Sequence, residues 1–170
     1  LSDNATHLYV NQNQYWYSTQ PTVTRTAKDR AAQIKEQQSH LIREEIVKRL
    51  RREGNRQGPF NAVHVAPQSS SEVVDEPSAR LVIFGPDDPH ISGTTDSAAI
   101  HSAKNILQDR GNQQRTYRNM LVFLAPDAAR LSELEDAVAS YLAWSSIVEE
   151  KDELNLDTHS RNQADTKCNK

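Results

Sequence analysis

The chain has 170 residues, 36% of them hydrophobic, and a mean hydropathy of -0.77. This length fits one ordinary domain with appendages, and the polar average predicts a modest core with long solvated helices and tails. A net charge of -3 excludes a global basic field that would draw the whole chain to nucleic acid or anionic lipid, so any such contact needs a local patch. The single cysteine, Cys168, excludes an intrachain disulfide. Since the sequence also shows no secretory leader and no membrane-spanning apolar stretch, we expect a soluble, cytoplasmic protein without membrane contact.

Residues 1–21 predict a β-hairpin. Two β-type runs, 6–10 and 15–19, flank a polar link whose asparagines tolerate the left-handed backbone of a tight turn, and Pro21 ends the second run. One interpretation makes this hairpin the wing of a winged-helix module, whose recognition helix would have to precede Leu1.

Residues 22–53 predict one long helix. Its apolar residues repeat at three- and four-residue steps: Ala27, Ala31, Ile34, Leu41, Ile42, Ile46 and Leu50. Thr24 or Thr26 can cap the start, and Gly54 and Gly58 punctuate the end. The last turns carry Lys48, Arg49, Arg51 and Arg52, which suit the negative end of the helix dipole.

Two similar segments, 79–88 and 118–127, carry the fold prediction. Each is an apolar run that stops at a small residue, a proline and an aspartate, as in strands that are buried on both faces in a parallel sheet. A helix predicted at 96–110 lies between them, which makes a βαβ unit. A short strand at 60–66 precedes this unit.

The expected fold is therefore α/β, with a small, mainly parallel sheet flanked by helices and an N-terminal hairpin. A second long helix begins at Asp127, and the polar residues 151–170 predict a frayed helix or a disordered tail. This divides the chain into a hairpin at 1–21, an α/β domain at 22–150 and a tail at 151–170.

A ligand of such a sheet would lie outside the carboxyl ends of its strands. Asp87, Asp88, His90 and Asp127 occupy these ends, so a hydrolase- or nuclease-like acidic site is one hypothesis. The alternative is a solvated acidic loop, with Asp127 as a helix N-cap. None of the glycines belongs to a P-loop or a dinucleotide fingerprint, and the histidines are scattered, so the sequence predicts no nucleotide or metal site in this chain.

Two groups of basic residues are candidates for contact with nucleic acid or a partner. Arg110, Arg115 and Arg118 surround the loop before the second similar segment, where guanidinium groups could bind phosphate or carboxylate. Arg25 and Arg30 lie where the hairpin meets the next helix, whose backbone N–H groups could bind an anion. Solvated loop charge and helix capping are the simpler alternatives.

Five segments together resemble a known family. They are 15–30 (YWYSTQPTVTRTAKDR), 62–67 (AVHVAP), 110–112 (RGN), 117–127 (YRNMLVFLAPD) and 131–144 (LSELEDAVASYLAW). They are similar to the C-terminal part of a large family of bacterial and archaeal proteins described as predicted AAA+-type ATPases with a domain of unknown function. Its members tend to be encoded beside DNA methyltransferases and helicases in anti-phage clusters.

The resemblance implies that this chain is the C-terminal part of a multidomain ATPase. ATP and Mg²⁺ would then bind the absent upstream part, and this chain would need no cofactor of its own. The expected partners are the remainder of the parent ATPase, and DNA or methyltransferase and helicase proteins. The resemblance implies a non-catalytic accessory role in assembly, interdomain coupling or DNA contact, and it carries no catalytic residue over to this chain.

Overall fold

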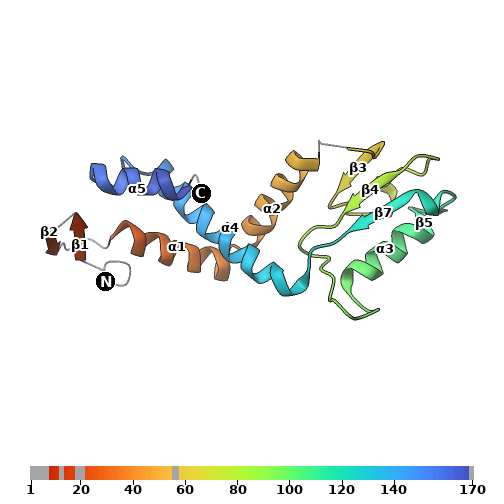
Figure 1. Ribbon diagram of the computed structural model, residues 1–170, viewed down its shortest axis with the longest axis horizontal. Helices are drawn as coiled ribbons and strands as arrows, with labels where there is room; N and C mark the ends of the chain where they lie inside the picture. The colour runs from red at the N-terminus through yellow and green to blue at the C-terminus, as the bar shows by residue number, and fades with distance from the viewer. Residues whose placement is uncertain (1–7, 12–13, 18–21, 55–57, 169–170) are drawn as a thin grey trace. The chain divides into compact units, whose positions relative to one another are not determined.

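The computed structural model describes residues 8–11, 14–17, 22–54 and 58–168 (Figure 1). The chain forms two compact units, one of residues Leu1–Ile42 and Glu135–Lys170 and one of residues Arg43–Leu134. They are called here the helical unit and the sheet unit. Two helices, α2 (Ser39–Gly54) and α4 (Ala128–Glu149), contribute residues to both. Within the described residues, no helix combines the length and the apolar character needed to cross a membrane.

The sheet unit is built on three parallel strands, β3 (Ala62–Val65), β4 (Arg80–Ile83) and β7 (Leu121–Leu124), in the order β3-β4-β7. In this register Val82 of β4 lies between His64 of β3 and Phe123 of β7. Helix α3 (Ala98–Gln108) connects β4 to β7, so the predicted βαβ unit and the α/β fold class are confirmed.

The two faces of the sheet are covered by different helices. On one face α3 packs into a core made of Val73, Val82, Phe84, Ala99 and Ile106. The rings of Phe84 and Phe123 stack there with their centroids 5.7 Å apart. On the other face the end of α2 lies so close to β3 that a Cβ atom at Gly54 would come within 2.8 Å of Val65 Cγ2. Glycine is therefore required at this position for the close approach.

One prediction about the sheet is wrong. The segment that became β7 was expected to be buried on both faces, but β7 is an edge strand. Its alternate residues Val122 and Leu124 are 48% and 55% exposed. An uninterrupted apolar run is typical of a strand that has helices packed on both faces. The sequence does not reveal that the face of β7 with Val122 and Leu124 is left partly exposed.

The long helix predicted at 22–53 is two helices, α1 (Val23–Gln37) and α2. Gln38 leaves helical geometry with φ -133° and ψ 35°, where the spacing of the apolar stripe is interrupted by glutamines. The N-cap is Thr22 rather than Thr24 or Thr26, since the Thr22 hydroxyl oxygen accepts a hydrogen bond from the Arg25 N–H at 3.3 Å.

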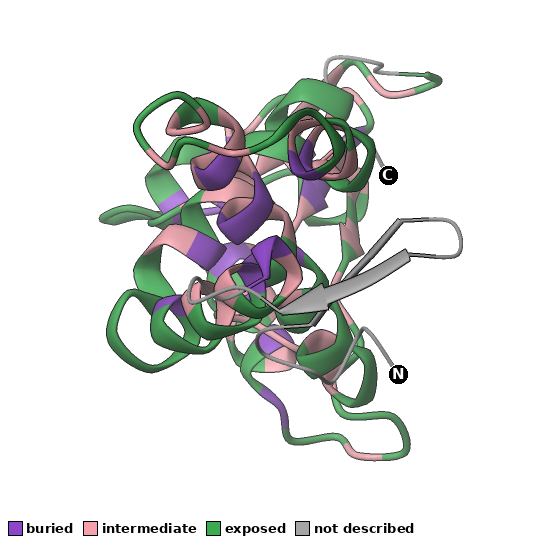
Figure 2. Cartoon of the chain, turned by 90° about the vertical axis from the view of Figure 1, so that its left-hand side faces the viewer, coloured by how far each residue is buried: buried purple, intermediate pink, exposed green. Residues whose placement is uncertain are grey.

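The helical unit contains a core formed by Val23, Ala27, Trp144, Ile147 and Ala164. Ala164 belongs to α5 (Thr158–Cys168), which forms in the segment predicted to be a frayed helix or disordered. Asp157 precedes α5 and accepts a 2.7 Å hydrogen bond from the Ser160 N–H. A polar helix with only one buried alanine gives almost no periodic signal, so its packing is not visible in the sequence. Figure 2 shows that buried, intermediate and exposed stretches alternate along the helices.

Two short hairpins complete the structure. β1 (Leu8–Asn11) pairs antiparallel with β2 (Gln14–Tyr17), as predicted, although the turn and Pro21 lie outside the described residues. In the sheet unit β5 (Asp109–Arg110) pairs with β6 (Gln113–Gln114) around Gly111, whose φ of 62° favours glycine. Two 3₁₀ turns, at Ser70–Glu72 and Arg118–Met120, lie in the same unit.

Ala164→Glu tests the packing of α5. Ala164 is 1% exposed, so an ionised carboxylate there has no space and no partner, and we expect a loss of about 2 kcal/mol or more of unfolding free energy. Urea denaturation followed by circular dichroism measures this loss. Asn162→Glu introduces the same charge on the exposed side of α5 and should change stability little. Equal stability of the two variants would contradict a packed α5.

Candidate functional site

The loop after β4 is tied to the end of β7 by its backbone. The His90 N–H donates to the Pro126 carbonyl at 2.8 Å, and the Ala128 N–H donates to the His90 carbonyl at 2.9 Å. His90 and Asp127 thus form a parallel β-bridge. The sequence predicts an acidic site of four residues, and the structure brings the backbones of these two side by side.

The side chains of the loop's aspartates have separate partners. Asp87 forms an ion pair with Arg43 of α2 at 3.0 Å, and both side chains are at least half exposed. Asp88 accepts a 2.5 Å hydrogen bond from the Ser102 hydroxyl of α3. The two carboxylates are therefore held by two different helices.

His90 and Asp127 also have local partners. His90 Nδ1 lies 3.1 Å from the Ser97 hydroxyl, and Asp127 Oδ1 accepts a 2.9 Å hydrogen bond from the Ala129 N–H at the start of α4. Asp127 thus acts as the N-cap that the alternative interpretation predicts. Across the described residues, no three side chains of His, Cys, Asp or Glu are arranged to hold a metal ion.

An apolar cavity of about 230 Å³ lies at the same carboxyl ends of β4 and β7. It is lined by Ile46, Leu50, Ile83, Phe84, Gly85, Pro86, Leu124, Ala125, Pro126, Leu131 and Leu134. Leu124 and Leu134 leave it open to solvent, because they are 55% and 43% exposed. The cavity occupies the position at which a parallel sheet holds ligands, but its lining is apolar where the sequence suggested carboxylates.

The basic residue at the centre of the predicted contact loop is buried. Arg115 has a side-chain exposure of 0%. Its guanidinium donates to the carbonyls of Ile106 at 2.6 Å, Val73 at 2.8 Å, Val74 at 3.2 Å and Ser70 at 3.3 Å. This corrects the prediction of a contact role for Arg115, whose side chain joins α3 to the segment between β3 and β4.

Asp75 strengthens the same connection, because it lies in the segment between β3 and β4 and binds the backbone just after Arg115. Its carboxylate accepts hydrogen bonds from the N–H groups of Thr116 and Tyr117 at 2.8 and 2.9 Å and lies 3.8 Å from the Arg115 guanidinium. Burial raises the pKa of Asp75, but the two N–H donors and the Arg115 charge outweigh it and hold that pKa below its ordinary value. The sequence analysis missed Asp75, and an acidic residue in a serine-rich loop offers no signal for it.

Arg80 and His64 lie near Arg115 on the α3 side of the sheet. The Arg80 side chain is 5% exposed and forms an ion pair with Glu76. Burial lowers the pKa of His64, and the charges of Arg80 and Arg115 lower it further against the opposing charge of Glu72. This favours a neutral imidazole at His64.

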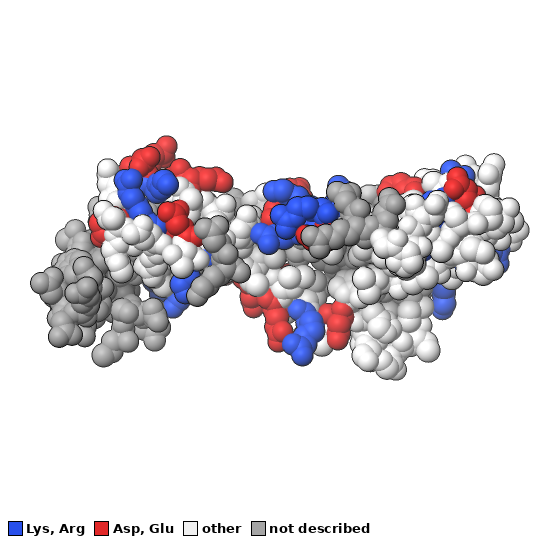
Figure 3. All heavy atoms as spheres, turned by 45° about the horizontal axis from the view of Figure 1, so that its top comes forward, with Lys and Arg blue, Asp and Glu red and all other residues white. Residues whose placement is uncertain are grey.

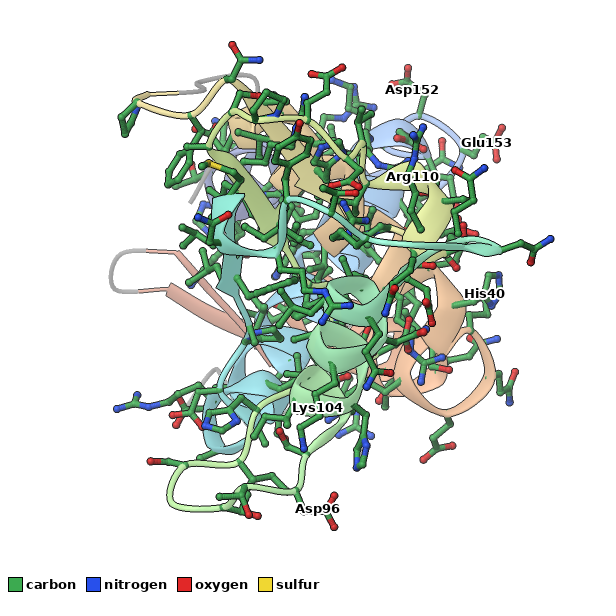
Figure 4. All side chains as sticks on the ribbon, turned by 90° about the vertical axis from the view of Figure 1, so that its right-hand side faces the viewer. His40, Asp96, Lys104, Arg110, Asp152 and Glu153 are labelled. Atoms are coloured by element: carbon green, nitrogen blue, oxygen red, sulfur yellow. The ribbon has the colours of Figure 1, made fainter. Side chains whose placement is uncertain are left out.

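The other arginines singled out in the sequence differ in accessibility. Arg110 and Arg118 are exposed, and Arg118 donates through Nε to the Arg115 carbonyl at 3.2 Å. Figure 4 shows Arg110 on β5. Arg25 forms an exposed ion pair with Asp29 at 3.0 Å. Arg25 belongs to the helical unit, and Arg110 and Arg118 belong to the sheet unit.

Arg30 is occupied within the helical unit. Its guanidinium donates to the Ser146 hydroxyl at 2.8 Å and to Glu150 at 2.7 Å. It also lines an open hollow of about 500 Å³ together with Gln33, Ile34, Gln38, Leu41, Leu142, Ser145, Ser146 and Glu149. Arg30 is the cation of this lining, and the Glu150 carboxylate already neutralises it. The hollow therefore offers little positive charge to an anion.

Comparison with known protein families, curated proteins and solved structures finds no match for this chain. Its candidate sites therefore rest on the geometry of the chain itself.

Arg115→Ala should destabilise the sheet unit by about 3–5 kcal/mol, because it leaves the carbonyls without their buried donor and Asp75 without its cation. Arg115→Lys should recover only part of this loss, since an ammonium cannot reproduce the forked geometry. Chemical denaturation measures both variants. Arg110→Ala is the matched exposed control, with an expected change of about 0.5 kcal/mol or less. An unchanged midpoint for Arg115→Ala would contradict a structural role.

Asp75→Asn should make stability less dependent on acidic pH. A carboxyl whose folded pKa is depressed stabilises the fold above its unfolded pKa and loses that contribution as the pH falls through the folded value. For Asp75 the loss begins near the ordinary value of 3.8 and continues below it. The difference in unfolding free energy between wild type and variant, followed from pH 7 to pH 2, should therefore shrink on acidification. A difference that stays constant would contradict the lowered pKa.

Proposed function

We propose that this chain is a non-catalytic C-terminal accessory domain of a predicted AAA+-type ATPase, with a role in assembly or interdomain coupling. The parent would bind ATP and Mg²⁺ upstream, and the chain's partner would be the remainder of that protein. A setting in phage defence, beside DNA methyltransferases and helicases, belongs to the same proposal. The resemblance of the five sequence segments supports the family, and an exposed apolar surface of the sheet unit supports the role.

This apolar surface consists of the exposed residues Val122 and Leu124 of β7 together with Leu134 of α4. Side chains alternate along a strand, so Val122 and Leu124 project from the same face of β7. Leu124 and Leu134 both line the cavity. Their exposed fractions lie between 43% and 55%, which is high for side chains of this size. Contiguous exposed apolar residues around a concavity are typical of protein–protein interaction sites.

The cavity's size favours a protein partner. At about 230 Å³ it is smaller than the clefts of roughly 300–1,000 Å³ that hold small molecules and cofactors. A cavity of this kind suits an apolar side chain that a partner inserts as an anchor. We therefore assign the surface to an apolar helix face of the ATPase part.

The alternative function, a hydrolase or nuclease with Asp87, Asp88, His90 and Asp127, has less support. Each of these side chains has a separate partner. A common reacting centre would require several of them to leave these partners together.

Val122→Ser combined with Leu124→Ser tests the proposed role. Removing the anchors should weaken binding of the chain to the separately expressed ATPase part about tenfold or more, since each large side chain contributes about 1.5–3 kcal/mol when fully buried. Isothermal titration calorimetry measures the affinity, and circular dichroism checks the fold. Burial of the apolar surface also predicts a negative heat-capacity change for the wild type.

Ile91→Ser is the matched control, because Ile91 is 53% exposed and lies in the loop after β4, outside the cavity lining. It should leave the affinity unchanged. The proposed role fails if the wild type does not bind the ATPase part, or if the double variant binds it as tightly as the control does.

A further inference from the structure

The second half of α2 has a concentration of positive charge. Lys48, Arg49, Arg51 and Arg52 fall within five consecutive residues, interrupted only by Leu50. All four side chains are exposed, and those of Lys48 and Arg52 are 79% and 72% exposed. Figure 3 shows Lys and Arg atoms gathered over this part of α2.

The packing of α2 directs these charges to solvent. Ile46 is 6% exposed, and Ile46 and Leu50 both line the apolar cavity, so they mark the side of the helix that faces the sheet. Steps of 100° per residue place Lys48 on the opposite side, with Arg51 and Arg52 flanking it. One side of α2 therefore builds the cavity, and the other presents Lys48, Arg51 and Arg52, while Arg49 lies at the border between the two sides.

Acidic residues neutralise only part of this charge. Glu45 accepts from Lys48 at 3.2 Å and from Arg49 at 2.8 Å, so two cations share one carboxylate. Arg52 lies 3.6 Å from Glu53. Among the ion pairs of the described residues, none includes Arg51. The exposed Glu44 also lies on this side of α2, one turn before Lys48, so the four cations outnumber the nearby carboxylates of Glu44, Glu45 and Glu53 by one.

Stabilisation of the helix dipole does not account for all four cations. The dipole is equivalent to about half an elementary charge, and its effect falls off within the last turn. Since α2 ends at Gly54, Lys48 and Arg49 lie more than one turn from its end. Arg51 and Arg52 suffice for that role.

We propose that Lys48, Arg51 and Arg52, with Arg49 at their border, form a basic surface that binds the phosphodiester backbone of nucleic acid. The guanidinium groups of three of the four residues can each bind two phosphate oxygens, which favours phosphate over a single carboxylate.

This surface is distinct from the apolar surface and from the loop that holds Arg110 and Arg118. Phosphate binding through α2 does not depend on the proposed function, because a domain can contact nucleic acid whether or not it docks on an ATPase. Of the five arginines that the sequence suggested for such contact, Arg115 is the one whose donors are occupied inside the sheet unit.

The test compares Arg51→Ala/Arg52→Ala with the wild-type chain in fluorescence anisotropy titrations of a labelled 20-bp DNA duplex at several salt concentrations. The wild type should bind with a slope of log K against log salt of about -2 to -4, since each neutralised phosphate contributes about -0.9. The variant should bind about tenfold more weakly at low salt, and its slope should be smaller in magnitude by about 2. The same titrations with duplex RNA decide which nucleic acid binds better.

Lys104→Ala/Arg130→Ala is the matched control, because it removes two charges from exposed positions on α3 and α4 of the same unit. Its affinity should stay within twofold of the wild type. Arg51→Lys/Arg52→Lys retains both charges and should retain most of the binding, which separates phosphate contact from a loss of fold.

Three results would overturn the proposal. The first is a wild type that binds neither duplex in a salt-dependent manner. The second is a control variant that weakens binding as much as the α2 variant does. The third is tighter binding of the chain to phosphatidylserine vesicles than to either duplex. The last result would assign the surface to an anionic membrane. Circular dichroism of each variant verifies that α2 is intact.

Discussion

The buried guanidinium of Arg115 is the interaction on which the sheet unit depends most. It binds main-chain carbonyls at the end of α3 and in the segment between β3 and β4, while Asp75 of that segment binds the backbone just after Arg115. The segment has little regular secondary structure, so its polar groups need partners from elsewhere in the chain. A single arginine supplies several donors at once, because its five N–H groups point in fixed directions. The reciprocal bonds of Asp75 close the connection and hold Val73 in the core.

This constraint changes the assignment of function. The loop around Arg115 carries guanidinium groups that could bind phosphate or carboxylate, yet the side chain of Arg115 is buried and held by the fold. The strand-end aspartates show the same effect, because Asp87 and Asp88 bind α2 and α3 respectively. Polar residues that appear chemically suggestive in the sequence thus serve to fasten loops to the sheet. The surfaces left for partners are of a different kind, one apolar and one basic.

Both remaining surfaces involve α2. Its inward side contributes Ile46 and Leu50 to the cavity beside β7, and its outward side carries Lys48, Arg51 and Arg52. An amphipathic helix at the side of a small sheet can therefore serve two partners, because its two sides face different surroundings. The edge position of β7 creates the apolar surface, since no helix of the described sheet unit covers Val122 and Leu124 fully. A coupling domain that contacts both a protein and a nucleic acid would need two separate surfaces of this kind, one apolar and one basic.

The sequence by itself determined the α/β class, the parallel pairing of β4 with β7, the N-terminal hairpin and the capping role of Asp127. These features follow from local patterns, namely apolar runs, turn residues and the preference of aspartate for helix starts. Only the tertiary structure decided that Arg115 is buried, that β7 is an exposed edge and that α5 packs through Ala164. Each of these depends on which segments distant in sequence become neighbours. An arginine or a valine has the same local signature whether or not another element covers it, so burial is decided by packing.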